Sequence, residues 1–130
     1  MNSEIVKRGT YEGYEYFIVF VGQMWYCAYV ILPDGNKYYG VEDYYSIPIE
    51  VHGGLTFADN HRLVDGQWCI GWDYAHLGDY IATFGDYRDD LMTDGFGMPP
   101  HRWSPDEIEY DCKDVIDQLV KLENGETPED

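Results

Sequence analysis

Two short segments carry the side chains best suited to chemistry. The first places His52 directly before a pair of glycines, and the second places Asp73, His76 and Asp79 three residues apart. This spacing would bring the side chains of the second segment to one side of a helical turn. With His52 nearby, the imidazoles and carboxylates have the chemistry of a metal site or of an acid–base pair.

Each segment also has a plainer structural interpretation. The N–H groups of Gly53 and Gly54 could hold an anion, but a glycine pair after a strand more often forms a bulge or a tight turn. Asp and His side chains at the end of a strand more often form a buried hydrogen-bond network that fixes an irregular loop. His61 and His101 lie in polar sequence, which predicts that they are surface residues.

The motifs of common enzyme classes are missing. The sequence has no GxSxG, no P-loop, no GxGxxG after a strand, no HExxH and no EF-hand spacing. Only three serines occur; Ser104 is expected to cap a helix, and Ser3 lies in a terminal tail. Serine hydrolase chemistry is therefore not expected, and the sequence names no catalytic residue, no metal and no cofactor.

The charge limits the classes of partner. The 130 residues include 25 acidic and 8 basic side chains, for a net charge of −17. Ordinary nucleic-acid binding needs clustered Lys and Arg, and anionic membranes attract the same residues. The acidic charge therefore argues against direct binding to nucleic acid or to a membrane. No signal peptide is recognisable, and no apolar stretch approaches the roughly 20 residues of a membrane helix. Three widely spaced cysteines, Cys27, Cys69 and Cys112, indicate reduced thiols in a cytoplasmic protein.

Runs of aromatic and β-branched residues predict strands, and a Pro-Asp-Gly-Asn turn predicts a hairpin. The expected extended segments are 14–21, 23–32, 37–39 (returning antiparallel after the turn), 47–52 and 67–74. Residues 78–103 show no clear period and are expected to form a long irregular loop.

The end of the chain carries the clearest local signal. Ser104-Pro105-Asp106-Glu107 has the pattern of a capping box, and apolar residues follow at helical spacing up to Asn124-Gly125. The sequence therefore predicts an α+β fold, a mostly antiparallel β-sheet packed by one C-terminal α-helix. We expect one domain over residues 1–130, with flexible ends at 1–10 and 124–130.

The motifs also carry a resemblance. VHGGLTF, followed by WCIGWDYAHLGD and a C-terminal helix with a cysteine in its second turn, resembles a family of small uncharacterised phage and prophage proteins. In that family the second motif reads Gly-Phe-Asp-Cys-Ala-His-Ala-Gly-Asp. This chain matches at Asp73, Ala75, His76, Gly78 and Asp79, and departs at Trp72, Tyr74 and Leu77. The resemblance covers roughly residues 49–120 and implies a phage or mobile-element origin without implying a reaction.

Acidic side chains concentrate in the second half of the chain. They include a predicted helix face (Asp106, Glu109, Asp114, Asp117) and a loop group (Asp86, Asp89, Asp90, Asp94). Carboxylates along a helix can imitate a phosphate backbone and attract a protein built to bind nucleic acid. Phage-encoded inhibitors of restriction and CRISPR nucleases are similar in size and charge. An acidic surface can also serve solubility alone.

Three hypotheses follow. The leading one is a non-enzymatic inhibitor that binds a basic host protein, such as a nuclease, through this acidic and DNA-mimicking surface. The second is a pocket for a nucleotide-like signal, with Trp72, Tyr74 or Trp68 stacking on a base and Gly53-Gly54 reaching a phosphate. Its residues would be His52, Gly53, Gly54, Trp72, Asp73, Tyr74, His76 and Asp79. The third is a metal-assisted hydrolase that uses His52, Asp73, His76 and Asp79.

Overall fold

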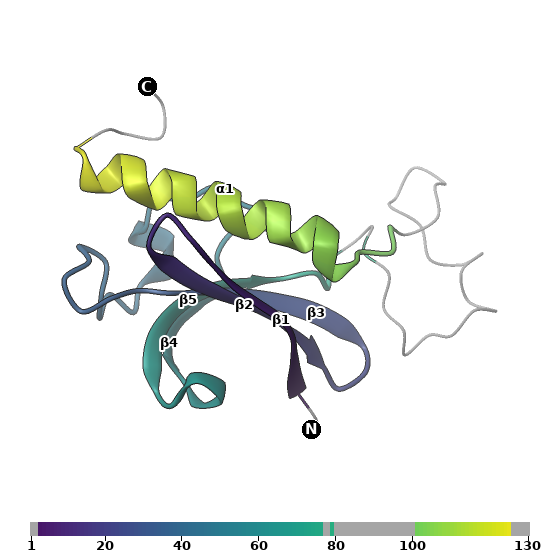
Figure 1. Ribbon diagram of the computed structural model, residues 1–130. Helices are drawn as coiled ribbons and strands as arrows, with labels where there is room; N and C mark the ends of the chain where they lie inside the picture. Colours follow the sequence, from purple (N-terminus) through teal and green to yellow (C-terminus); the bar gives the residue numbers. More distant parts are fainter. Residues whose placement is uncertain (1–2, 77–78, 80–100, 126–130) are drawn as a thin grey trace.

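The computed structural model describes residues 3–76, 79 and 101–125. In this part of the chain, an antiparallel sheet of five strands carries one long helix across one face (Figure 1). The elements in chain order are β1 (Ser3–Tyr11), β2 (Tyr14–Val21), β3 (Trp25–Ile31), the short 3-10 helix η1 (Tyr44–Ser46), β4 (Phe57–His61), the 3-10 helix η2 (Arg62–Val64), β5 (Gln67–Asp73) and α1 (Pro105–Glu123). The predicted α+β fold is confirmed.

The order of strands in the sheet positions the motif segment. The strands lie in the order β1-β2-β3-β5-β4, and every neighbouring pair is antiparallel. After β3, residues 32–56 cross to the far edge, where β4 forms, and β5 then returns between β4 and β3. The last residue of β5, Asp73, consequently pairs with Cys27 of β3, next to the start of the motif that follows.

Strand β2 separates two apolar clusters. Tyr16 and Ile18 pack into the larger cluster beneath α1, whereas Phe17 and Val19 belong to a second cluster on the opposite face of the sheet. Successive strand residues point to opposite faces, so a strand that is apolar at nearly every position must be covered on both. The strand predicted over residues 14–21 is thus confirmed, and it lies between β1 and β3 in the sheet.

Helix α1 begins as its sequence predicts. Ser104 Oγ accepts a hydrogen bond from the Glu107 N–H at 3.3 Å, and Glu107 Oε1 accepts one from the Ser104 N–H at 3.1 Å, which completes the capping box. The helix buries Ile108, Cys112, Val115, Ile116 and Leu119 against the sheet and ends at Glu123, with Asn124 as its C-cap. Among the described residues, no helix is long and apolar enough to cross a membrane.

Tyrosines of the sheet side fasten α1 through its carboxylates. Three phenols each donate a hydrogen bond to an acidic side chain of the helix: Tyr14 to Glu123, Tyr16 to Glu109, and Tyr74 to Asp111 at 2.5 Å. A hydrogen bond to an ionised acceptor is stronger than one between neutral groups. Much of the negative charge of α1 is therefore engaged in holding the helix on the sheet.

Two predictions about the first half of the chain are wrong. Residues 3–11 form the edge strand β1, where a flexible end was expected, because β2 offers them a complete ladder of backbone partners. Residues 37–39 do not return as a strand, since β5 occupies the free edge of β3. The segment is turned away by Asn36, which is buried, donates to the Tyr14 hydroxyl at 2.8 Å and accepts from the Tyr38 N–H at 2.8 Å.

Residues 47–61 also differ from expectation. Ile47 and Ile49 are buried, but residues 47–52 join no strand ladder; instead the side-chain amide of Gln118 bonds both the N–H and the carbonyl of Glu50, at 2.8 and 2.7 Å. Strand β4 lies outside the extended segments that the sequence predicts. Its ladder with β5 satisfies the backbone although its side chains are mostly polar. Of the predicted loop 78–103, residues 78 and 80–100 lie outside the described part.

Candidate functional site

The structure brings His52, Asp73, His76 and Asp79 together. His52 Nε2 lies 2.9 Å from Asp79 Oδ2, and His76 Nδ1 lies 3.5 Å from the same oxygen. The other ring nitrogen of His76, Nε2, lies 3.5 Å from Asp73 Oδ1. The four side chains thus form one continuous line of imidazoles and carboxylates, which we call the polar cluster.

A turn rather than a helix makes this convergence possible. The predicted helical turn over residues 73–79 is not present in the described residues: 74–76 form a bend after β5, and the Asp79 N–H donates to the His76 carbonyl at 2.9 Å. The Asp79 carboxylate also accepts from the His76 N–H at 3.0 Å. Asp79 therefore fixes the local backbone as well as both imidazoles.

The Asp79 carboxylate is the buried centre of the polar cluster. Its side chain is only 2% exposed, and a buried carboxylate is costly unless donors satisfy it. Trp103 Nε1 donates to Oδ1 at 2.7 Å, while His52 and the His76 backbone hold Oδ2. Sequence reasoning missed Trp103; the only available signal was its place directly before the helix cap Ser104.

The glycine pair serves the packing of the polar cluster. Gly53 has φ +71°, and a Cβ there would lie 2.2 Å from His76 Cε1, so only glycine allows the imidazole to rest on this backbone. The Gly54 N–H donates to the Val51 carbonyl at 2.8 Å, which makes the segment a tight turn. The Gly54 amide is therefore engaged and does not make the phosphate contact that the pocket hypothesis assigned to it.

Three aromatic residues proposed to stack on a ligand are buried instead. Trp72 and Tyr74 are 1% exposed and Trp68 is 7% exposed, because all three point into the core beneath α1. Trp72 Nε1 donates to the Tyr74 hydroxyl at 2.9 Å. The Tyr74 ring packs against the polar cluster, because the His52 imidazole stacks on it. The two ring centroids lie 4.8 Å apart, and the ring planes differ by 10°.

A cavity of about 570 Å³ opens on the face of the sheet opposite α1, and we call it the sheet-face pocket. Ligand pockets commonly measure about 300–1,000 Å³. Its floor and walls come from all five strands and from η2. They include Ser3, Val19, Val21, Trp25, Cys27, Tyr29, Thr56, Phe57, His61, Arg62, Leu63, Trp72, Asp73 and Ala75.

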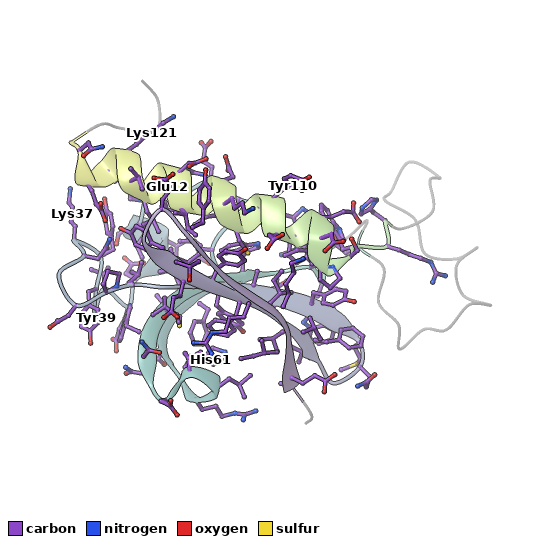
Figure 2. All side chains as sticks on the ribbon, in the orientation of Figure 1. Glu12, Lys37, Tyr39, His61, Tyr110 and Lys121 are labelled. Atoms are coloured by element: carbon purple, nitrogen blue, oxygen red, sulfur yellow. The ribbon has the colours of Figure 1, made fainter. Side chains whose placement is uncertain are left out.

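Residues that pair on neighbouring strands place a row of aromatic rings along the sheet-face pocket. Tyr29 and Phe57 both pair with Gly71, whose missing side chain leaves room for the Tyr29 ring: a Cβ on Gly71 would lie 2.4 Å from Tyr29 Cδ1. His61, labelled in Figure 2, covers this row, and the centroid of its ring lies 4.4 Å from that of the Tyr29 ring. The prediction that His61 is a surface residue is wrong: it is half-buried, because η2 folds it back over the sheet.

Burial shifts the pKa of several side chains that line the sheet-face pocket. It raises the pKa of the Cys27 thiol to about 11, with a smaller contribution from the charge of Asp73. Burial also raises the pKa of Tyr29 and, together with the adjacent Arg62, lowers the pKa of His61. Near neutral pH these groups favour an uncharged thiol, phenol and imidazole, so Arg62 and Asp73 supply the charge at this site.

Asp73 belongs to both sites. Its Oδ1 accepts from the Ala75 N–H at 3.2 Å and faces His76, while its Oδ2 accepts from the Thr56 hydroxyl at 3.1 Å. Thr56, Asp73 and Ala75 also line the sheet-face pocket. The polar cluster therefore borders the rim of that pocket.

The predicted acidic helix face is only partly a free surface. Asp106, Asp114 and Asp117 are exposed, although Asp106 Oδ1 pairs with Lys7 Nζ at 2.7 Å. Glu109 does not belong to that face: it is 24% exposed, accepts from Tyr16 and lies 3.4 Å from Lys7, because this side of α1 faces β1 and β2. Asp86, Asp89, Asp90 and Asp94 of the acidic loop lie outside the described residues.

Comparisons with models of protein families, with curated proteins and with solved structures give no match to this chain. The resemblance to phage proteins thus stays a prediction, and the functional argument depends on the geometry of the two sites. His52, His76 and Asp79 are the described residues whose donor atoms gather closely enough to hold a metal ion, all within 4.8 Å of one another.

Proposed function

We propose that this protein binds a small planar molecule with an anionic group, such as a nucleotide-like signal, in the sheet-face pocket. The observation that carries the proposal is the combination of aromatic rings with Arg62 in a cavity of about 570 Å³. This is the second sequence hypothesis with its residues reassigned. Trp25, Tyr29 and Phe57 take the stacking role that the hypothesis gave to Trp68, Trp72 and Tyr74, because these three are buried; Trp72 borders the cavity but is only 1% exposed.

Charge supports an anionic ligand at one particular side chain. Arg62 is exposed and takes part in none of the ion pairs of the described residues. A guanidinium binds phosphate or carboxylate in a bidentate manner, which gives both affinity and orientation. Asp73, on the rim, would accept from hydroxyl or amino groups of the same molecule.

The test is a thermal-shift and calorimetric screen with mono-, di- and cyclic nucleotides, together with mass spectrometry of small molecules released on denaturation. A ligand at 100 times its Kd stabilises a protein by about 2.7 kcal/mol.

The Arg62→Gln variant should bind at least about tenfold more weakly. Arg8→Gln is the matched control, because Arg8 pairs with Glu15 on the β1–β2 ribbon, outside the pocket. An unresponsive screen with nothing released, or equal binding by Arg62→Gln, would refute the proposal.

A second function is favoured by the outer face of α1. Tyr110 is 77% exposed and lies one turn from both Asp106 and Asp114 (Figure 2). An exposed tyrosine among carboxylates is a composition suited to an interface with a basic protein. It supports the leading sequence hypothesis, a phage-type inhibitor of a host defence or nucleic-acid-handling protein.

The inhibitor hypothesis has a direct test. Restriction and CRISPR nucleases would be assayed with the protein at about 0.1 M and about 0.5 M salt, since screening weakens an acidic interface. Asp114→Lys combined with Asp117→Lys should abolish inhibition. Asp34→Lys with Glu42→Lys changes the net charge equally at exposed sites outside the helix and should preserve it. Inhibition that ignores both salt and the helix variants would exclude this surface.

A further inference from the structure

The polar cluster has the donor geometry of a metal site. His52 Nε2 and His76 Nδ1 lie 2.9 and 3.5 Å from Asp79 Oδ2, and the three atoms lie within 4.8 Å of one another. Zinc bonds to nitrogen and oxygen are about 2.0–2.2 Å long, which separates tetrahedral ligand atoms by roughly 3.3–3.5 Å. The three donors thus lie around one point, and a bound ion would bring their separations to about 3.3–3.5 Å.

A second observation identifies which nitrogen of His76 would bind. The Nδ1 atom of His76 is buried and has no hydrogen-bond partner among the described residues. Its Nε2 atom faces Asp73 Oδ1 instead, at 3.5 Å. An imidazole whose Nε2–H points to a carboxylate presents its Nδ1 lone pair to the centre of the polar cluster. This unpartnered nitrogen and the other two ligands therefore converge.

The surrounding residues support the ligands as outer-shell partners do in metal proteins. Metal-binding histidines usually donate their second N–H to a carboxylate or carbonyl, and ligating carboxylates are themselves hydrogen-bonded. Asp73 Oδ1 lies 3.5 Å from His76 Nε2, on the side where the first partner would be, and Trp103 Nε1 fills the second role by donating to Asp79 Oδ1 at 2.7 Å. Gly53 leaves the space into which the His76 ring fits.

We propose that the protein binds one Zn²⁺ ion per chain through His52 Nε2, His76 Nδ1 and Asp79 Oδ2. Two imidazoles and one carboxylate are a common zinc set, and three protein ligands leave the fourth position open to water or to a ligand. The His52 and His76 side chains are 28% and 36% exposed, so the ion can enter from solvent. The site requires neither Arg62 nor the aromatic rings, so it stands or fails independently of the proposed small-molecule function.

The experiment uses the full chain after treatment with a chelator. Isothermal titration with ZnCl₂ should give one site per chain. In the same wild-type protein, nitrogen-edited NMR of the four imidazoles should show Zn²⁺-dependent shifts at His52 and His76, with His61 unmoved. This readout needs no substitution, so misfolding of a variant cannot obscure it.

Variants then test the ligands. His52→Ala and His76→Ala should each weaken Zn²⁺ binding at least 100-fold. His61→Asn, which removes the histidine packed on Tyr29 in the sheet-face pocket, should leave affinity unchanged. The proposal is overturned if wild type binds no Zn²⁺, if the NMR signals of His52 and His76 do not shift, or if folded His52→Ala and His76→Ala proteins keep wild-type affinity. In those cases the polar cluster is a hydrogen-bond network that fixes the turn after β5.

Discussion

The imidazole of His76 rests directly on the backbone of Gly53, so closely that a single added carbon on Gly53 would lie 2.2 Å from His76 Cε1. This contact joins the two motifs of the sequence, which are 23 positions apart. It also explains the glycine physically: the residue is needed for the space above its Cα as well as for its φ of +71°. Gly54 shares the unusual φ, at +80°, but a Cβ added there would have nothing within 4 Å.

The two glycines therefore make a matched pair of variants. Gly53→Ala and Gly54→Ala should both incur the left-handed backbone cost of about 1–2 kcal/mol. Gly53→Ala should lose a further 1–3 kcal/mol or so of unfolding free energy, because His76 must move. It should also lose Zn²⁺ affinity, which Gly54→Ala retains. Urea denaturation and calorimetry measure both effects, and equal stability of the two variants would show that the contact does not constrain His76.

Asp73→Asn tests the partner role of Asp73. The amide keeps one oxygen, which can accept from the Ala75 N–H in place of Oδ1, and its NH₂ group in place of Oδ2 can donate to the Thr56 hydroxyl oxygen; the charge facing His76 is removed. Loss of an outer-shell partner typically weakens metal binding about 10–100-fold, and we expect a change in that range for Zn²⁺. Asp34→Asn removes a charge from an exposed turn and serves as the control. Wild-type Zn²⁺ affinity in the Asp73→Asn protein would argue against the orienting role.

Tyr74→Phe tests how α1 is fastened. The variant removes the phenol that donates to Asp111 at 2.5 Å and accepts from Trp72 Nε1 at 2.9 Å. Since Trp72 is buried, its N–H would lose its partner, and we expect a loss of about 1–3 kcal/mol in unfolding free energy. Tyr110→Phe removes a phenol from the exposed face of the same helix and should change stability by less than about 0.5 kcal/mol. Similar values for the two variants would contradict the bridging role of Tyr74.

Local chemistry explains which parts of this architecture the sequence predicts well. The Ser104 capping box and the apolar spacing of α1 need only residues within a few positions, and β2 is recognisable because it is apolar at nearly every position. The edge strand β4 fails these rules, because its residues are mostly polar and its only strong partner is β5, which follows later in the chain. Asn36 likewise turns the chain through contacts that depend on Tyr14, 22 positions away.

The residues of the candidate site likewise divide into those that the sequence predicts and those that depend on distant contacts. The motif residues His52, Asp73, His76 and Asp79 could be selected from chemistry and spacing. Trp103 could not, because its contact with Asp79 depends on how the N-terminus of α1 meets the turn after β5. The sheet-face pocket could not be predicted either, since its rings and Arg62 come together only through the β4 crossover.

The Cys27 thiol should react slowly although it borders the sheet-face pocket. Burial and, to a smaller degree, Asp73 raise its pKa to about 11, so about one thiol in a thousand is ionised at pH 8. Alkylation followed by mass spectrometry should be roughly two orders of magnitude slower than in the urea-unfolded chain, and should accelerate up to about pH 11. Rapid labelling of folded protein at neutral pH would contradict the burial of this thiol.

Acid should destabilise the protein through His61. Burial, and less strongly Arg62, lower the pKa of this imidazole in the folded state. Below the ordinary His pKa of about 6.5, His61 binds a proton more readily in the unfolded chain than in the folded chain. The free energy of unfolding therefore decreases as the pH is lowered, by at most about 1.4 kcal/mol per pH unit. His61→Asn keeps an acceptor for the Leu63 N–H but does not titrate. Urea denaturation from pH 7.5 to 5 should therefore show a shallower loss for His61→Asn than for wild type, whereas parallel curves would mean that His61 protonates equally in both states.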